Sequence, residues 1–191
     1  IPFASFVYFS NQENSYLNDS INKPKDVVER LKDSISHIII LKPNGIFSGN
    51  YEADSNTRAI EFWSQKYAEI EQKKLNVYDT VNEELICESF KRYCDRIAIK
   101  NNMTFIAMIR SISPIPIFNA VVVKVLDLSI TLKFDYVAKK IEQTAEVPMI
   151  CLQSESLNYL FNNSFGFDTL TVNACFEEGR PGGFVAATKS L

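Results

Sequence analysis

The sequence predicts an α+β protein, in which a mixed α/β segment is followed by an antiparallel sheet with helices packed on one side. Two observations support this class. In the first half of the chain, apolar residues recur every three to four positions, which is the period of a helix. After Pro114 and Pro116 the period changes to two, as in a strand with one apolar and one polar face. The change of period places a boundary near Pro114.

The N-terminal segment is predicted to contain a strand, a helix and a second strand. Residues 1–9 are apolar and aromatic, which is typical of a strand. A helix is expected over residues 24–34, because it begins with a proline and its apolar residues recur every four positions. Residues 38–41 form a short apolar run typical of a buried strand, and turn residues at 43–45 end it.

Two longer helices are expected next. Apolar spacing over residues 57–74 fits one helical face. Residues 80–83 have the pattern of a capping box, which predicts that a second helix starts there and continues to Ile97.

The last third of the chain reads mainly as strands. Residues 126–134 alternate strictly between apolar and polar side chains, which predicts one antiparallel strand. Residues 147–152 predict a second strand, Ser154 a helix cap, Gly166 a turn, and residues 170–176 a further alternating strand.

These elements suggest three parts. Residues 1–75 form the α/β segment, residues 76–113 a helical connector, and residues 114–191 a small antiparallel α+β module.

The composition of the chain disfavours several classes of function. The chain has 20 Lys and Arg against 23 Asp and Glu, so its net charge of -3 disfavours nucleic acid as a partner. An apolar run of about 18 residues is missing from the sequence, so no membrane span is expected.

The four cysteines lack CxxC spacing, which favours reduced thiols and a cytoplasmic location. His37 is the single histidine, so neither a HxHxDH metal motif nor a Ser-His-Asp relay with a spare ligand can be assembled.

One loop carries the candidate binding residues. Glu13, Asn14, Asn18 and Asp19 place four oxygen-bearing side chains within seven positions. Such a set could contribute to a site for a hard cation or a sugar. The same composition also arises in a polar loop that satisfies its own backbone through Asx-turns.

A second candidate is the apolar face of the predicted sheet. If helices leave the apolar side chains of residues 126–134 and 170–176 uncovered, a pocket for a lipid-like ligand remains. Ordinary core packing is the alternative explanation.

The N-terminal residues carry a resemblance to a known family. Residues 1–6, 11–19 and 24–27 are an aromatic strand that leads into an E-N-x-Y-x-N-D loop and a Pro-started helix. This pattern, within about the first 75 residues, resembles the later part of the metallo-β-lactamase-like fold of UlaG-like hydrolases and of the CMP-N-acetylneuraminate hydroxylase group. The resemblance implies a four-layer αββα parent protein with a divalent metal. Its ligands come mainly from an upstream HxHxDH motif, so no cofactor is expected in this chain.

The C-terminal residues carry a second resemblance. The segment over residues 146–157, with Gly166 and residues 172–173, is similar to sterol-carrier-type domains that are appended to some metallo-β-lactamase-fold proteins. This similarity implies that the module binds an apolar ligand or forms a dimer interface.

Together these observations predict a C-terminal region of a metallo-β-lactamase-like hydrolase or hydroxylase-related protein. Taken alone it is expected to be catalytically inert, and its expected partner is the upstream part of the same protein. Two alternatives stay open: a module that binds a small apolar ligand, and a structural domain that forms a homodimer.

Overall fold

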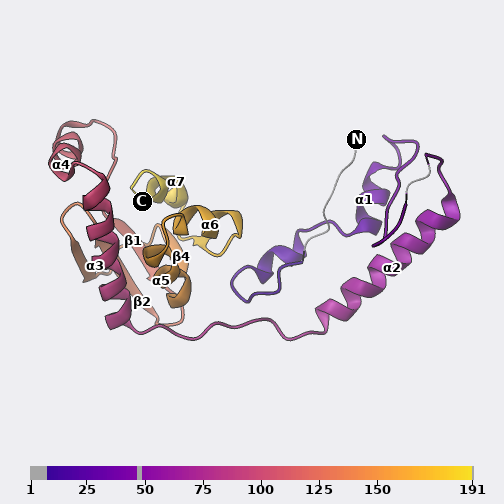
Figure 1. Cartoon of the computed structure of the whole chain (residues 1–191), viewed down its shortest axis with the longest axis horizontal. Coiled ribbons are helices and arrows are strands. Elements are labelled where there is room, and N and C mark those ends of the chain that lie inside the picture. Colours follow the sequence, from indigo (N-terminus) through magenta and orange to yellow (C-terminus); the bar gives the residue numbers. More distant parts are fainter. Residues whose placement is uncertain (1–7, 47–48, 191) are drawn as a thin grey trace. The chain divides into compact units, whose positions relative to one another are not determined.

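The computed structural model describes residues 8–46 and 49–190, and the chain divides into two compact units (Figure 1). The N-terminal unit comprises residues 1–76 and the C-terminal unit residues 77–191. Helices dominate the first unit, and helices with a mixed sheet form the second. The predicted α+β class is confirmed.

The N-terminal unit is built on two helices. A short 3-10 helix, Ser15–Asp19, precedes helix α1 (Pro24–Leu31). Helix α2 follows at Ala53–Glu71. The helices predicted at 24–34 and 57–74 are therefore present, the first ending earlier and the second beginning earlier than expected. An ion pair between Lys23 and Glu71 links the two helices.

The strand predicted at residues 38–41 does not form. Instead, the Ile40 N–H donates to Asn56 Oδ1 at 2.7 Å, and Trp63 Nε1 donates to the Leu41 carbonyl at 2.8 Å. Both Asn56 and Trp63 belong to α2, so side chains of a helix take the place of a neighbouring strand. An apolar run signals burial but does not supply a strand to pair with.

The strand predicted at residues 1–9 falls mostly outside the described residues, which begin at Tyr8; Tyr8 and Phe9 are not in a strand. The two ends of the N-terminal unit meet at Asn76. The Asn76 N–H donates to the Ser10 carbonyl at 2.8 Å, and the Gln12 N–H donates to the Asn76 carbonyl at 2.9 Å.

The C-terminal unit begins with two helices and continues with strands and shorter helices. These elements are α3 (Glu83–Lys100), α4 (Met103–Ile112), β1 (Val121–Val125), β2 (Ile130–Asp135), β3 (Lys140–Gln143), β4 (Ile150–Leu152), α5 (Ser154–Asn162), α6 (Gly166–Val172), β5 (Glu177–Glu178) and α7 (Gly183–Thr188). Asn82 caps α3, because its Oδ1 accepts the Leu85 N–H at 2.9 Å. The predicted capping box placed this role on Thr80.

The sheet is mixed rather than antiparallel. Its order is β3-β2-β1-β4-β5, and all neighbours are antiparallel except β1 and β4. Strand β4 pairs with β1 in the parallel direction, and Val123 lies opposite Ile150. Alternation along one strand shows which face is buried but not the direction of its neighbour, so the sequence could not predict this pairing.

Two strand predictions were wrong in detail. Residues 126–134 are not one strand, because a turn around Ser129, which has a φ of 55°, separates β1 from β2. Residues 170–176 are not a strand, because the chain is helical to Val172 and then turns. Helix α6 begins at Gly166, the predicted turn, where an added Cβ would lie 2.6 Å from the Leu160 carbonyl oxygen.

The core of the C-terminal unit lies between the sheet and helices α3 and α5. Three phenylalanine rings join these layers, with centroids 5.2 Å apart for Phe90 and Phe134, 5.3 Å for Phe90 and Phe161, and 5.1 Å for Phe134 and Phe161. Helix α3 also buries Ile86 and Cys94 in the same core. Residues 76–113 are therefore not a separate connector, because α3 is part of the second unit.

Within residues 8–46 and 49–190, no helix is both long enough and apolar enough to cross a membrane.

We expect Phe161→Ala to destabilise the C-terminal unit by about 3–5 kcal/mol, because it opens a cavity where three layers meet. The free energy of unfolding in urea, followed by circular dichroism, measures this. Phe165→Ala is the control, since Phe165 is 74% exposed and its truncation should cost no more than about 0.5 kcal/mol. Equal losses for the two variants would contradict the packing described here.

Candidate functional site

The loop that carries the four predicted binding residues lies in the N-terminal unit, around the 3-10 helix. Asn18 fastens this loop to the preceding segment. Its Oδ1 accepts the Phe9 N–H at 2.9 Å, and its Nδ2 donates to the Phe9 carbonyl at 2.8 Å. The amide of Asn18 is thus engaged with backbone, as in the alternative interpretation of a self-satisfying polar loop.

The other three residues of the set differ in burial. Asn14 is 4% exposed, Glu13 is half-buried and Asp19 is exposed. Over residues 8–46 and 49–190, no group of three or more His, Cys, Asp and Glu side chains is arranged to hold a metal ion. Binding of a ligand by Glu13, Asn14, Asn18 and Asp19 therefore stays a prediction from composition.

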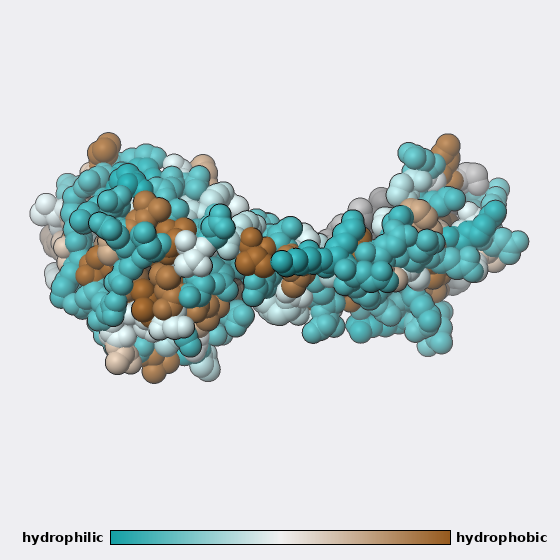
Figure 2. All heavy atoms as spheres, turned by 90° about the horizontal axis from the view of Figure 1, so that it is seen from below, coloured by the Kyte–Doolittle hydropathy of each residue, from teal (hydrophilic) through white to brown (hydrophobic). Residues whose placement is uncertain are grey.

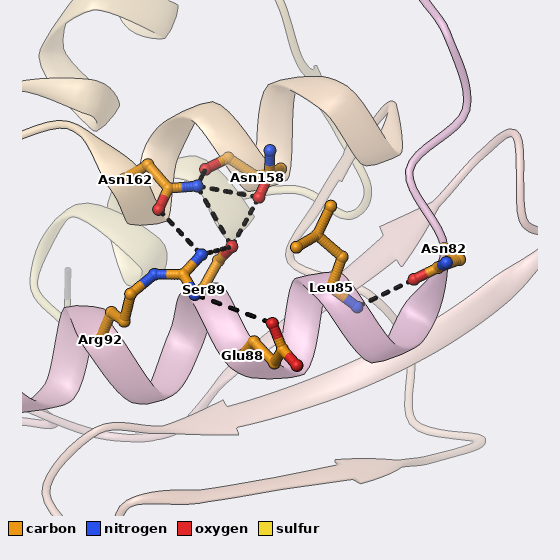
Figure 3. Close-up of polar contacts among 7 residues, drawn as sticks. All are labelled: Asn82, Leu85, Glu88, Ser89, Arg92, Asn158 and Asn162. Carbon is orange, nitrogen blue, oxygen red and sulfur yellow. Dashed lines mark hydrogen bonds and ion pairs between the residues drawn. The ribbon is translucent and has the colours of Figure 1, made fainter.

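A denser polar cluster lies between α3 and α5 in the C-terminal unit (Figure 3). The Ser89 hydroxyl is buried and donates to Asn158 Oδ1 at 2.6 Å. It accepts from Arg92 Nη2 at 2.9 Å and from Asn162 Nδ2 at 3.1 Å. Asn162 Nδ2 also donates to Asn158 Oδ1 at 2.9 Å. These side chains bind one another across the helix pair.

Arg96 extends this contact to the end of α5. Its guanidinium donates to the carbonyls of Phe161 at 2.8 Å and of Asn163 at 3.3 Å. A cation at the C-terminal end of a helix stabilises carbonyls that have no partner within the helix. The cluster of Ser89, Arg92, Asn158 and Asn162 and the Arg96 cap therefore form a structural link between α3 and α5, which sequence spacing alone could not reveal.

Burial or hydrogen bonding surrounds several side chains that could act as nucleophiles. Burial raises the pKa of Cys94 to about 11 and also raises the pKa values of Cys87 and Cys151, so these thiols are protonated at neutral pH. The Ser154 hydroxyl donates to Asp127 Oδ2 at 2.5 Å and accepts the Val81 N–H at 2.7 Å. His37 lies in the other unit, where its ring packs 4.7 Å from the Tyr51 ring.

The apolar face of the sheet is covered. Val125, Leu132 and Ile150 are 0% exposed, and they pack with α3 and α5 in one core. The sequence predicted a lipid-like ligand on this face only if helices left it uncovered. Within the described residues, the helices do cover it.

Exposed apolar side chains lie elsewhere. Figure 2 views the end of the C-terminal unit where α3 begins, and it shows apolar side chains gathered there among polar ones. Leu85, in the first turn of α3, is 40% exposed. The N-terminal unit and helix α4 also present exposed apolar residues.

Comparison with protein-family models, with curated proteins and with solved structures found no match to this chain. The resemblances of residues 1–75 to the metallo-β-lactamase-like fold and of residues 146–173 to sterol-carrier-type domains therefore stay predictions. What the structure defines is the class: an α+β protein with a helix-covered mixed sheet and a separate helical unit.

We expect Ser89→Ala to lower the free energy of unfolding by about 1–2 kcal/mol, because it removes the buried hydroxyl that bonds Asn158, Asn162 and Arg92. Chemical denaturation measures the loss. Ser111→Ala removes an exposed hydroxyl and should change stability by no more than about 0.5 kcal/mol. If Ser89→Ala behaved like this control, the cluster would not link the two helices energetically.

Cys94 should resist alkylation by iodoacetamide in the folded protein at neutral pH and react once the chain is unfolded in denaturant. Its folded pKa of about 11 lies above the ordinary value of 9.0, so the folded state holds this proton more tightly. The associated stability is complete below about pH 9 and is lost as the pH rises towards about 11. Peptide mass spectrometry identifies the modified thiols, and equal rates in the folded and unfolded chains would contradict the burial.

Proposed function

We propose that the chain is a non-catalytic interaction module whose N-terminal unit completes its core on the surface of another folded protein region. The upstream part of the same protein is the proposed partner, as the resemblance of residues 1–75 to part of an αββα fold implies. The metal chemistry of such a parent would then belong to that partner region.

The observation that carries this proposal is the imbalance between buried and exposed apolar side chains in the N-terminal unit. Among its described residues, the buried apolar side chains are Pro24, Ile40, Ala59 and Tyr67. The large apolar side chains that are more than a third exposed form the exposed apolar set: Tyr16, Leu31, Ile35, Ile39, Leu41, Ile46 and Tyr51.

Energetics explain why this imbalance matters. Burial of one large apolar side chain contributes about 1.5–3 kcal/mol. Ordering the backbone costs about 1–2 kcal/mol for every residue, and a unit of fewer than about 80 residues gains little net stability from one small core. A partner surface that covers the exposed apolar set would add the burial that this unit lacks.

The kind of partner follows from where the set lies. Apart from Tyr16, its members run from Leu31, at the end of α1, to Tyr51, just before α2. Covering side chains that are distributed over this many residues requires the area of a protein interface rather than of a small molecule.

Hydrogen exchange of the full chain tests this proposal. We expect the amides of residues 31–51 to exchange much faster than those of α3, β1, β2 and α5, because local stability follows the number of buried apolar contacts. Exchange is read by mass spectrometry at several protein concentrations, together with the mass in solution by light scattering.

Three results would overturn the proposal. Protection of residues 31–51 equal to that of the sheet, in a monomer, would show that the N-terminal unit needs no partner. Protection that grows with concentration, along with a doubled mass, would assign the surface to a second copy of the chain. Metal-dependent hydrolysis of phosphoesters, lactones or esters by the purified chain would contradict a non-catalytic role.

A further inference from the structure

Residues 38–41 pair with no strand among the described residues, yet their burial alternates as it does in a strand. Ile38 is half-buried and Ile40 is 7% exposed. The other two residues, Ile39 and Leu41, are 39% and 47% exposed. A period of two in burial is the pattern of an extended chain with one covered face. Three of the four residues are isoleucine, a β-branched type that favours strands.

Helix α2 anchors the backbone of this segment. The Ile40 N–H donates to Asn56 Oδ1 in the first turn of the helix, and Asn56 itself is buried. Further along the helix, Trp63 Nε1 donates to the Leu41 carbonyl. The segment therefore has a fixed place in the N-terminal unit, beside α2.

Three backbone groups of the segment define an open edge. In an extended chain, the N–H and carbonyl of one residue point to the same edge, and those of the next residue point to the opposite edge. The bond to Asn56 uses the edge on which the Ile40 N–H lies. The Ile39 N–H, the Ile39 carbonyl and the Leu41 N–H belong to the other edge. These three groups form no hydrogen bond within residues 8–46 and 49–190, and we call them the open edge.

The chemistry of the open edge identifies what can cover it. Backbone donors and acceptors at strand spacing are matched by the backbone of another strand, as when an extended segment is added to the edge of a sheet. A short run that is apolar on both faces is also typical of a strand inside a sheet with both faces covered. A lipid chain or a small apolar ligand offers no matching row of donors and acceptors. The open edge therefore fits a strand.

The described part of this chain does not offer a strand of the matching kind. The two outer strands of its sheet are β3 and β5. Strand β3 exposes Lys140, Glu142 and Gln143, and β5 consists of two exposed glutamates. Charged residues on an edge strand oppose pairing with an apolar segment. A second copy of residues 38–41 would form only a two-stranded ribbon of four residues, which is marginally stable in water. A larger sheet with an apolar edge is the better partner.

We propose that residues 38–41 join an apolar sheet edge of the partner region as an added strand, with the open edge facing the partner and α2 retained on the other side. This inference rests on the proposed function, because it names the way in which the N-terminal unit binds its partner. The pairing supplies hydrogen bonds to the open edge, and the partner sheet covers Ile39 and Leu41.

Solvent exchange of single amides in the full chain, measured by NMR, tests this proposal. The probe is the capped, soluble peptide Lys-Val-Thr-Val-Thr-Val-Lys at millimolar concentration, which offers the backbone of one strand. We expect the Ile39 and Leu41 amides to exchange fast in the chain alone and at least about fivefold more slowly with the probe. The Ile40 amide, already bonded to Asn56, should change by less than about twofold.

Two variants at one position separate the backbone from the side chain. Ile39→Pro removes an N–H from the open edge and should weaken binding of the probe at least about tenfold. Ile39→Val is the matched control, since it keeps the N–H and a β-branched side chain, and it should bind within about twofold of the unmodified chain. Circular dichroism and thermal unfolding show whether both variants fold. The exchange measurement on the unmodified chain does not depend on either variant.

Several results would overturn strand addition. One is a probe that slows exchange at neither Ile39 nor Leu41, and another is equal binding by the two variants. Slow exchange of both amides in the chain alone, as a monomer, would show that the edge is already covered. Slow exchange that grows with concentration, along with a doubled mass, would assign the edge to a second copy. Fast exchange throughout residues 31–51 without an effect of the probe would overturn strand addition and leave the proposed function standing, so the two can fail separately.

Discussion

The contact among Phe90, Phe134 and Phe161 is the constraint on which the C-terminal unit depends. One ring comes from α3, one from β2 and one from α5, so a single cluster fixes the distance between two helices and the sheet. The polar link around Ser89 then sets how α3 and α5 lie against each other, because hydrogen bonds are directional where apolar contacts are not.

The sequence predicted helices α1, α2 and α3 but missed α4, and it predicted the strands less well, for a physical reason. Helical periodicity is local, so α1, α2 and α3 could be recognised from residues a few positions apart. A strand needs a partner that local sequence does not name. Residues 38–41 are apolar, but their backbone hydrogen bonds go to side chains of α2 and not to a neighbouring strand. Residues 170–172 alternate in polarity, but they continue helix α6. The parallel pairing of β1 with β4 could not be predicted either, because the pattern of one strand does not show the direction of its neighbour.

The candidate binding residues show that local sequence is also a limited guide to a binding site. Oxygen-bearing side chains were found by composition, which cannot tell an amide that is open to a ligand from one that serves the backbone. Asn18 is of the second kind, since both ends of its amide bind Phe9. The exposed apolar side chains of α4 were missed although their signal was present. Phe105, Met108 and Ile112 follow helical spacing, but sequence does not show which face of a helix meets the core.

The distance along the chain between α3 and α5 has a consequence for biosynthesis. Ser89 and its partner Asn158 are 69 residues apart, and Ala187, near the end of the described chain, is 0% exposed in the same core. A ribosome releases α3 long before the residues that cover it, so its apolar face must wait in solution or be held by a chaperone until α5 emerges. Folding of this unit is therefore expected to be completed only after α7 has left the ribosome.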